Sequence, residues 1–396
     1  MLPSTTLRVA LPVPLPRLFD YLPPADASPV AVGQRVRVPF GPRELCGLVI
    51  EHAQAEPGVA LKSVLAVLDD APLLHGELLA SLRWLAGYLH APLGEVLATA
   101  LPALLRRGEP LPEIAQYGWR LNEAGHTALP AMRAGKPKAL AQWLDQLRAE
   151  DSLDAAHPGW RAPLRTLRER GLVERQETGS GSLPQVLRES EPDPVSFSPN
   201  PEQQAAIDAI QAAQGFASFL LDGVTGSGKT EVYLQAIAAC LARGQQALVL
   251  VPEIGLTPQA LARFRARLGV PVHALHSGLN DSERAKVWLQ AASGQARVIV
   301  GTRSAVFVPL PQAGLIVIDE EHDGSYKQFD GIRYHARDFA LLRARALAVP
   351  IVLGSATPSL ETLHNARTGK FTGLRLRQRA GAAQPPQVRV QDVRKR

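Results

Sequence analysis

Cysteine is scarce in this sequence of 396 residues, which contains only Cys46 and Cys240. The two are far apart, and neither belongs to a Cys-x-x-Cys pair. A zinc site built from cysteines is therefore excluded within this chain, and a framework of disulfides is not expected.

Long apolar runs are also absent. No run approaches the roughly 20 consecutive residues that a membrane-spanning helix needs. The apolar stretch over 1–22 is interrupted by four prolines and lacks a basic start before a continuous apolar core, so we do not expect a signal peptide. The sequence therefore predicts a cytoplasmic protein with no membrane partner.

Acidic residues are outnumbered by basic ones, 37 to 43, and the formal net charge is +6. A positive balance suits a polyanionic partner such as nucleic acid, although many basic proteins bind none. Charge alone leaves the partner open, so the motifs have to decide.

The length allows two or three domains of ~100 to 200 residues each. In the first, over 1–105, apolar and basic residues alternate at 35–40, a Gly-Pro turn leads into a second apolar strand, and leucines recur at helical spacing over 78–89. This pattern predicts a small β-rich domain that ends in a helix.

Residues 106–180 are mostly helical in pattern and end in a basic helix that Gly171 stops, followed by a short apolar strand. That order predicts a winged-helix-like domain, and a helical spacer with solvated arginines is the alternative. Residues 181–198 are rich in Gly, Ser, Pro and Glu, which predicts a linker.

From 199 to 370 a unit repeats, in which a short apolar run ends in a polar or glycine-rich turn and a helical pattern follows. Such near-continuous apolar runs suit strands buried on both faces, so we predict an α/β lobe of RecA-like, P-loop type with a parallel sheet. Ligands of these sheets bind beyond the carboxyl ends of the strands. The runs occupy 218–221, 247–251, 272–275, 297–300, 315–318 and 351–353.

The first turn of this lobe, at 223–230, matches the pattern Gly-x4-Gly-Lys-Ser/Thr between a predicted strand and a predicted helix. In that context glycines let backbone N–H groups face a phosphate, and the helix N-terminus adds partial positive charge. We expect Lys229 to reach the terminal phosphates and Thr230 to ligate Mg²⁺. The predicted ATP-binding residues here are Gly223, Val224, Thr225, Gly226, Ser227, Gly228, Lys229 and Thr230.

Asp319 and Glu320 directly follow the apolar run at 315–318. One carboxylate can hold magnesium while the next orients and deprotonates the attacking water. We therefore predict Asp319 as a magnesium ligand together with Thr230, and Glu320, Asp319 and Lys229 as the catalytic residues of an ATP hydrolase. A solvated acidic turn is the alternative, but it does not explain two adjacent carboxylates after a buried strand.

Gln203 lies upstream of the phosphate loop, where helicases use a glutamine to recognise adenine. We predict that it contacts ATP. A glutamine on the surface of a helix is the alternative, and the neighbouring Gln204 leaves the assignment ambiguous.

Eight motifs in the second half of the chain together resemble the PriA-type primosomal replication-restart helicases of superfamily 2. The likeness extends to LPVPLPRLFDYLP and RVRVPFG near the N-terminus, so it covers nearly the whole chain. The set is highly specific. The eight motifs are GVTGSGKTEVY, VPEIGLTPQ, LHSGLNDSER, GTRSAVF, VIDEEHD, SYKQ, RYHARD and GSATPSLET.

The resemblance implies that the N-terminal domain captures the 3′ end of a leading strand at a replication fork. Phe19, Asp20, Tyr21 and Lys62 match its end-binding pocket. An aromatic ring can stack on a base, a carboxylate can accept hydrogen bonds from base or sugar, and a lysine can meet phosphate. Without the resemblance, Phe19 and Tyr21 would be interpreted as core residues.

The resemblance also implies that the segment 323–338 senses single-stranded DNA and reports to Glu320, with aromatic rings as stacking faces and cations, Arg337 among them, as phosphate contacts. The family commonly has Trp where this chain has Ile332, and Phe329 stands three residues earlier, so which aromatic couples stays open. The predicted coupling residues are Tyr326, Lys327, Arg333, Tyr334, Ser355 and Thr357, and the further DNA contacts are Thr257 and Arg303.

The function implied is that of an ATP- and Mg²⁺-dependent 3′-to-5′ DNA helicase that recognises stalled or abandoned forks and initiates replication restart. Branched DNA with a leading-strand 3′ end, single-stranded DNA-binding protein and other primosome proteins are the implied partners, and the location is the nucleoid. Two alternatives are a fork and 3′-end binding module without catalysis of its own, and a double-stranded DNA translocase.

The basic segment 371–396 leaves no room for a second sheet. We therefore expect the second helicase lobe to be missing, together with the cysteine-rich zinc region of the full-length family. Because that second lobe supplies an arginine to the transferred phosphoryl group, we expect this chain to hydrolyse ATP poorly alone.

Overall fold

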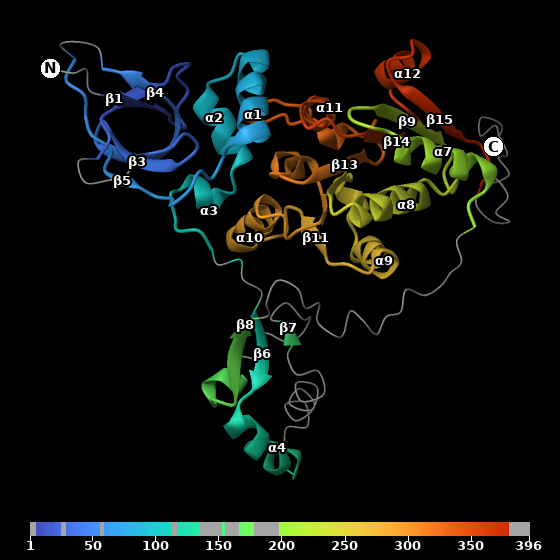
Figure 1. The fold of residues 1–396 in the computed structure, drawn as a ribbon, viewed down its shortest axis with the longest axis horizontal. Helices are drawn as coiled ribbons and strands as arrows, with labels where there is room; N and C mark the ends of the chain where they lie inside the picture. The colour runs from blue at the N-terminus through green and yellow to red at the C-terminus, as the bar shows by residue number, and fades with distance from the viewer. Residues whose placement is uncertain are drawn as a thin grey trace, which may run out of the picture.

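The computed structural model describes residues 5–24, 29–55, 59–112, 114, 117–134, 153–154, 166–177 and 198–379. The predicted linker over 181–198, except for residue 198, and the basic segment beyond 379 lie outside these residues. Figure 1 shows a curled N-terminal sheet, a group of helices beside it, and a larger α/β lobe.

The N-terminal sheet has five antiparallel strands in the order β2-β1-β4-β3-β5. The predicted pair of strands around the Gly-Pro turn is confirmed as β3 and β4. Alternation along β4 sends Val49 into the sheet's own core while Leu48 and Ile50 face the helices that follow. The strands are β1 (Thr5–Ala10), β2 (Phe19–Tyr21), β3 (Arg35–Phe40), β4 (Arg43–Gln54) and β5 (Ala66–Val67).

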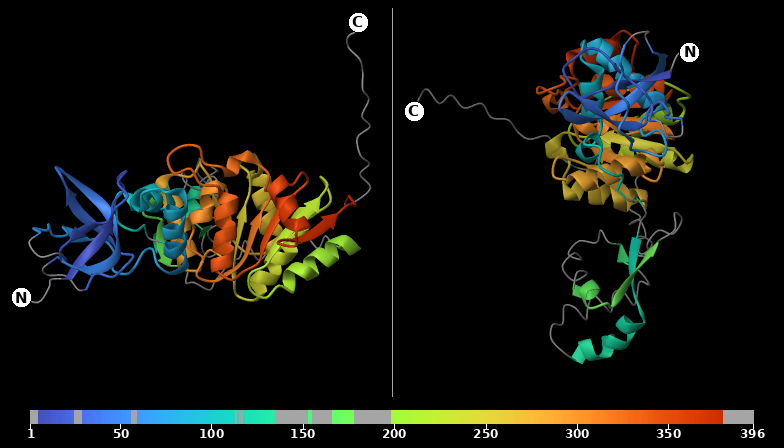
Figure 2. Two further views of the ribbon diagram at one scale, coloured as in Figure 1. Left: turned by 90° about the horizontal axis from the view of Figure 1, so that it is seen from above. Right: turned by 90° about the vertical axis from the view of Figure 1, so that its left-hand side faces the viewer.

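Three helices follow this sheet: α1 (Gly76–Leu89), α2 (Leu93–Ala100) and α3 (Ala103–Arg106). The leucine repeat of α1 behaves as predicted, since Leu78, Leu82 and Leu85 are buried. In the left view of Figure 2 these helices lie beside the N-terminal sheet on its side toward the α/β lobe.

A separate small sheet, in the order β7-β6-β8, is described within 106–180. It consists of β6 (Tyr117–Leu121), β7 (Leu153–Asp154) and β8 (Val173–Glu177), with α4 (Glu123–Ala134) after β6. A helical turn over 166–169 ends at Gly171, which adopts the left-handed φ of 63°, and β8 follows as the sequence pattern indicated. A winged-helix assignment stays a prediction.

The α/β lobe contains seven strands, all paired in parallel, in the order β11-β12-β10-β13-β14-β9-β15. Each of the six predicted apolar runs forms a strand. They are β9 (Ser218–Gly223), β10 (Gln246–Leu250), β11 (Val272–Leu275), β12 (Val298–Gly301), β13 (Ala313–Ile318) and β14 (Ile351–Ser355).

The seventh strand, β15 (Thr372–Leu376), was not predicted. It pairs with β9 at the edge of the sheet, so the lobe continues past the boundary we expected at 370, and 371–376 is no free basic segment. β15 was missed because it lies at the edge of the sheet. Leu376 is the one fully buried side chain of β15, so the strand has no continuous apolar run.

Helices cover both faces of this sheet. Alternate residues of the strands enter two different cores, since Leu248 and Leu250 of β10 belong to one and Val249 to the other. The helices are α7 (Pro201–Gln211), α8 (Lys229–Ala242), α9 (Pro258–Leu268), α10 (Asp281–Ala292), α11 (Ala336–Ala346) and α12 (Leu360–Arg367). Among the described residues, no helix is both long and apolar enough to span a membrane.

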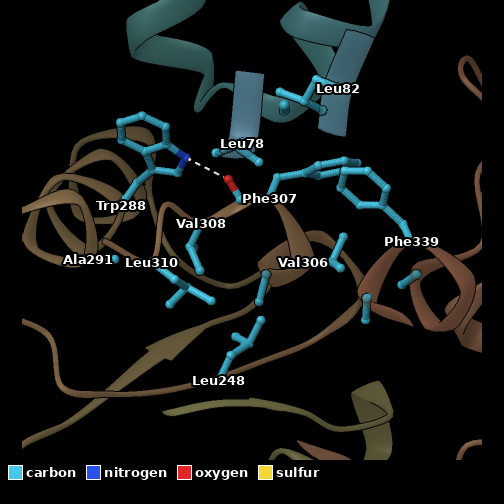
Figure 3. Packing of buried hydrophobic residues seen from close by; sticks show 14 of the residues in the cluster. Leu78, Leu82, Leu248, Trp288, Ala291, Val306, Phe307, Val308, Leu310 and Phe339 are labelled. Carbon is cyan, nitrogen blue, oxygen red and sulfur yellow. Dashed lines mark hydrogen bonds between the residues drawn. The ribbon is translucent and has the colours of Figure 1, made fainter. Parts of the chain in front are cut away.

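The N-terminal helices and the α/β lobe share one hydrophobic core. Leu78 and Leu82 of α1 belong to the same buried cluster as Phe307 and Phe339 of the lobe (Figure 3). The indole N–H of Trp288 donates to the carbonyl of Phe307 at 3.1 Å within that cluster. The two domains therefore form one packed unit.

A buried ion pair crosses the same interface. The Arg343 guanidinium of α11 donates to both carboxylate oxygens of Glu77 on α1, and to the carbonyls of Val306 and Val308 at 2.7 and 2.8 Å. The Arg343 side chain is fully buried and that of Glu77 is 16% exposed. Because every one of these acceptors is fixed in the interface, the pair sets how α1 sits on the lobe.

Candidate active site

The predicted phosphate loop connects β9 to α8 at the carboxyl edge of the sheet. Gly226 and Gly228 have φ of 80° and 83°, a conformation that side chains disfavour, and Gly228 caps the helix that begins at Lys229. The Lys229 ammonium is buried and donates to the carbonyl of Gly223 at 2.9 Å. The hydroxyl of Ser227 is buried without a hydrogen-bond partner among the described atoms. Donors held inward in this way suit an anionic group.

The two predicted acids stand at the end of β13, which β14 separates from β9 in the sheet. The Lys229 ammonium nevertheless lies 3.6 Å from the Glu320 carboxylate, so the loop and the acids meet at the carboxyl edge of the sheet. Burial raises the pKa of the Asp319 carboxyl, and the charge on Glu320 raises it further. Glu320 has a φ of 45°, an uncommon conformation for a residue with a side chain. A freely solvated acidic turn does not match this geometry.

The oxygen atoms needed for magnesium are present in the same place. Thr230 and Asp319 line one cavity of about 150 Å³. Hydroxyl and carboxylate oxygens are the hard ligands that Mg²⁺ takes, usually one or two from protein with the rest from phosphates and water. The residues therefore fit the ion. Within the part of the chain that the structure describes, no group of three or more His, Cys, Asp or Glu side chains could hold a metal.

Gln203 is buried and braces the phosphate loop. Its amide N–H donates to the carbonyl of Ser227 at 2.8 Å, and its side-chain oxygen accepts from the backbone N–H of Asn200 at 2.9 Å. The surface-glutamine alternative is wrong for Gln203, and it describes Gln204, which bonds to Asp208 on the exposed face of α7. Contact between Gln203 and adenine stays a prediction.

His322 joins the acids to the predicted coupling motif. Its Nδ1 lies 2.7 Å from the hydroxyl of Ser355 and 3.7 Å from the carboxylate of Glu320, and its Nε2 lies 3.3 Å from the hydroxyl of Thr357. The Nδ1 edge of the ring thus faces Glu320 and Ser355, and the Nε2 edge faces Thr357. His322 was not predicted as a functional residue from the sequence, although it lies only two residues after Glu320.

Glu321 is the second residue whose position the sequence did not indicate. Its fully buried carboxylate accepts from the guanidinium of Arg337 at 2.9 Å, the backbone N–H of Ser359 at 2.7 Å and the hydroxyl of Thr362 at 3.0 Å. Arg337 was expected to contact phosphate. That prediction is wrong for the described structure, because the Arg337 guanidinium forms an ion pair with the buried carboxylate of Glu321.

The aromatic segment differs from the prediction in which rings are accessible. Tyr326 and Tyr334 are buried at 0% and 2% exposure, so neither offers a stacking face. The hydroxyl of Tyr326 donates to the carbonyl of Asp319 at 2.6 Å, and the ring of Tyr334 packs edge-on against Phe307. Phe329 is 68% exposed. Of the segment's aromatic rings, Phe329 is therefore the one placed to stack on a base.

Arg303 holds the backbone of this segment through hydrogen bonds. Its guanidinium donates to the carbonyls of Ser325 at 3.1 Å and Lys327 at 2.8 Å, so it positions backbone rather than projecting toward a strand of DNA. Arg333 is exposed and Lys327 half-buried. The predicted DNA contact of Arg303 does not match this arrangement, because its guanidinium is bonded to backbone carbonyls.

Thr257 occupies the start of α9 after β10. It is exposed, and its hydroxyl accepts from the backbone N–H of Ala260 at 3.1 Å. Helix N-termini favour anions such as phosphate. Its predicted contact with DNA therefore remains compatible with its position.

In the N-terminal domain, the structure brings the four predicted end-binding residues to one place. Phe19, Asp20 and Tyr21 form β2, and the chain at Lys62 pairs with Leu22 through a backbone hydrogen bond of 2.9 Å. Asp20 and Lys62 are exposed.

The two aromatic side chains of β2 differ. Tyr21 is buried, and its hydroxyl donates to the carbonyl of Pro39 at 3.1 Å, so the core interpretation holds for this residue. Phe19 is half-buried, with its ring 5.4 Å from that of Phe40 and the guanidinium of Arg17 at 5.0 Å over it. Asp20, which pairs with Arg8, is thus better placed than Tyr21 to touch a ligand.

Comparisons with known proteins follow the same division. A 3′DNA-binding domain (3′BD) of PriA type matches residues 8–102, and a DEAD/DEAH box helicase domain matches residues 200–366. Replication restart protein PriA of Haemophilus influenzae is 42% identical, over 95% of this chain and 52% of that protein. PriA of Chlamydia pneumoniae is 32% identical over 94% and 51%, and PriA of Bacillus subtilis is 32% identical over 96% and 56%.

The chain spans about half the length of the curated relatives it matches. Both matched domains coincide with units of the structure: the N-terminal sheet with its first helices, and the seven-stranded lobe. The chain is thus similar along nearly its whole length to the replication restart protein PriA, with one part that matches a 3′DNA-binding domain and another that matches a DEAD/DEAH box helicase domain.

Proposed function

We propose that this chain is the ATP-binding and fork-recognising part of a 3′-to-5′ DNA helicase that initiates replication restart at stalled or abandoned forks. One observation carries the proposal: the Lys229 ammonium, the Glu320 carboxylate and, through His322, the hydroxyl of Ser355 meet at one edge of the sheet. At this edge the proposed nucleotide site is linked through His322 to Ser355 at the end of β14.

The residues divide the chemistry between them. Lys229 and the backbone N–H groups of the loop bind the phosphates of ATP, and Thr230 and Asp319 would hold magnesium. When bound, the magnesium ion neutralises the phosphate charge that develops during hydrolysis. Glu320 orients the attacking water and takes its proton. His322 contacts Glu320, Ser355 and Thr357, so a change in the position of Glu320 can shift the two coupling residues.

Contacts to DNA are proposed at two separate places. Phe329 and Arg333 belong to the segment that follows the acids and are exposed, so the bases of a single strand can stack on the ring and its phosphates can pair with the arginine there. Asp20 and Lys62 form the end-binding surface of the N-terminal domain. Because the two domains share one core, both DNA sites are held in one unit. Single-stranded DNA-binding protein and other primosome proteins are the partners we propose in the nucleoid.

Replacement of Phe329 by alanine is expected to weaken binding of single-stranded DNA by about 5- to 100-fold, because stacking of one base contributes about 1–3 kcal/mol. Fluorescence anisotropy with a labelled oligonucleotide measures the change. Phe216→Ala is the matched control, since Phe216 is also exposed but precedes β9 at the opposite edge of the sheet. Equal losses in both variants would contradict the assignment of Phe329.

Forks that differ only at the leading-strand 3′ end test the proposed function. We expect a free 3′ hydroxyl to bind about tenfold more tightly than a 3′ phosphate, since a lost hydrogen bond to a charged group costs about 1.5–3 kcal/mol. Asp20→Ala should remove most of this difference, while Asp70→Ala, an exposed carboxylate in the same domain, should keep it. A salt series on the same forks counts phosphate contacts.

The same experiment separates the alternatives. A double-stranded DNA translocase would bind both forks alike, in the wild type and in both variants. A binding module without catalysis would show the end preference but no fork unwinding that Lys229→Ala could abolish. Failure of the wild type to distinguish the two ends at any salt concentration would overturn fork-end recognition.

A further inference from the structure

Tyr233 is buried at the point where three elements of the nucleotide site meet. It lies on α8, four residues after Lys229 and therefore about one helical turn beyond the phosphate loop. The side chain is 1% exposed. Its hydroxyl donates to Oδ1 of Asp319 at 3.0 Å.

The ring of Tyr233 also explains a glycine in the neighbouring strand. A Cβ atom at Gly354 of β14 would lie 1.5 Å from the Tyr233 hydroxyl and 2.7 Å from the ring carbon that bears it. Gly354 itself accepts from the backbone N–H of Glu321 at 3.0 Å, and the next residue is Ser355, which contacts His322. The hydroxyl therefore sits between the ends of β13 and β14.

The backbone and the carboxylate of Asp319 are held by different partners. Its N–H donates to Leu250 at 2.9 Å, and its carbonyl accepts from the hydroxyl of Tyr326 at 2.6 Å. These bonds place the residue but leave the rotation of its side chain free. Tyr233 acts on the carboxylate itself, in the cavity that Thr230 and Asp319 share.

We propose that Tyr233 is a positioning residue for the magnesium site: its hydroxyl holds the Asp319 carboxylate in the orientation that meets the ion beside Thr230, and its ring ties that carboxylate to Gly354 and so to the coupling motif. The proposal rests on the proposed function. Hydrogen bonds that orient a ligating carboxylate typically change metal affinity by about 10- to 100-fold when removed.

The test is the magnesium dependence of nucleotide binding in Tyr233→Phe, which keeps the ring and removes the donor. A fluorescent ATP analogue is titrated at a series of Mg²⁺ concentrations and in excess EDTA. We expect the half-maximal Mg²⁺ concentration to rise about tenfold, while the affinity in EDTA stays at the wild-type value. Trp288→Phe is the control, because it also removes one buried hydrogen bond in the same lobe but lies away from the loop and should leave both quantities unchanged.

A second variant shows whether Tyr233 acts through Asp319. Asp319→Asn should itself raise the Mg²⁺ requirement, and adding Tyr233→Phe to it should have little further effect, because residues acting through one group are not additive. An unchanged Mg²⁺ requirement in Tyr233→Phe, or an equally large effect in the Asp319→Asn background, would overturn the inference. If the wild type binds no nucleotide under either condition, the proposed function itself fails.

Discussion

Replacement of Arg343 by methionine is expected to lower the free energy of unfolding by about 3–5 kcal/mol, the range for breaking a buried ion pair. Methionine keeps most of the apolar stem but removes the charge. Glu77, itself only 16% exposed, then loses a bidentate partner, and the carbonyls of Val306 and Val308 lose their donor. Urea unfolding followed by tryptophan fluorescence measures the loss.

A second ion pair across the same interface provides the control. The Arg107 guanidinium pairs with Asp281 at 2.9 Å, but both side chains are 50% exposed. Exposed pairs contribute about 0–1 kcal/mol, so Arg107→Met should change stability little. If both arginine variants lose the same amount, burial of Arg343 is not what fixes the N-terminal helices to the lobe.

Lys229→Ala should weaken binding of Mg·ATP by about 10- to 100-fold, since a hydrogen bond to a charged group contributes about 1.5–3 kcal/mol. In the structure this ammonium is buried, 2.9 Å from the Gly223 carbonyl and 3.6 Å from the Glu320 carboxylate, and its charge also acts on the Asp319 carboxylate. A phosphate group would take the place of these partners. Equilibrium titration with a fluorescent ATP analogue gives the affinity.

The DNA sites supply an internal check on that variant. Because Lys229 lies at the nucleotide loop and not at β2, fork binding in the absence of ATP should be unchanged in Lys229→Ala. Lys286→Ala, which removes an exposed lysine of α10, should alter neither affinity. Loss of fork binding in Lys229→Ala would show that the substitution disturbs the fold rather than the nucleotide site.

Six strands of the α/β lobe could be predicted because they are buried on both faces of the sheet. A parallel strand covered on both faces must be apolar at nearly every position, and the sequence contains six apolar runs of this kind. β15 was missed because it lies at the edge of the sheet and only Leu376 is fully buried, so its sequence carries no continuous apolar run.

The phosphate loop and the acids were also predictable, since each is a local pattern in a fixed relation to a strand. Burial of Tyr326 and Tyr334 was not. A segment rich in aromatic and basic residues has the same composition whether its rings face DNA or the core. The buried Tyr326 hydroxyl donates to a backbone carbonyl seven residues earlier, and composition does not reveal such a contact.

Contacts between distant segments were out of reach for the same reason. Glu77 and Arg343 are 266 residues apart, and neither stands in a motif. Tyr233 offered a weak signal, because it shares a helix face with Lys229 in the phosphate-loop motif, and Gly354 offered another. Only their distance in the structure joins the two.

The most direct measurement of the central claim is a titration of the 396-residue chain with a fluorescent ATP analogue, in Mg²⁺ and in excess EDTA. We expect one saturable site per chain, displacement by unlabelled ATP, and weaker binding in EDTA. Absence of saturable binding at millimolar nucleotide, or binding that neither Mg²⁺ nor Lys229→Ala affects, would contradict it.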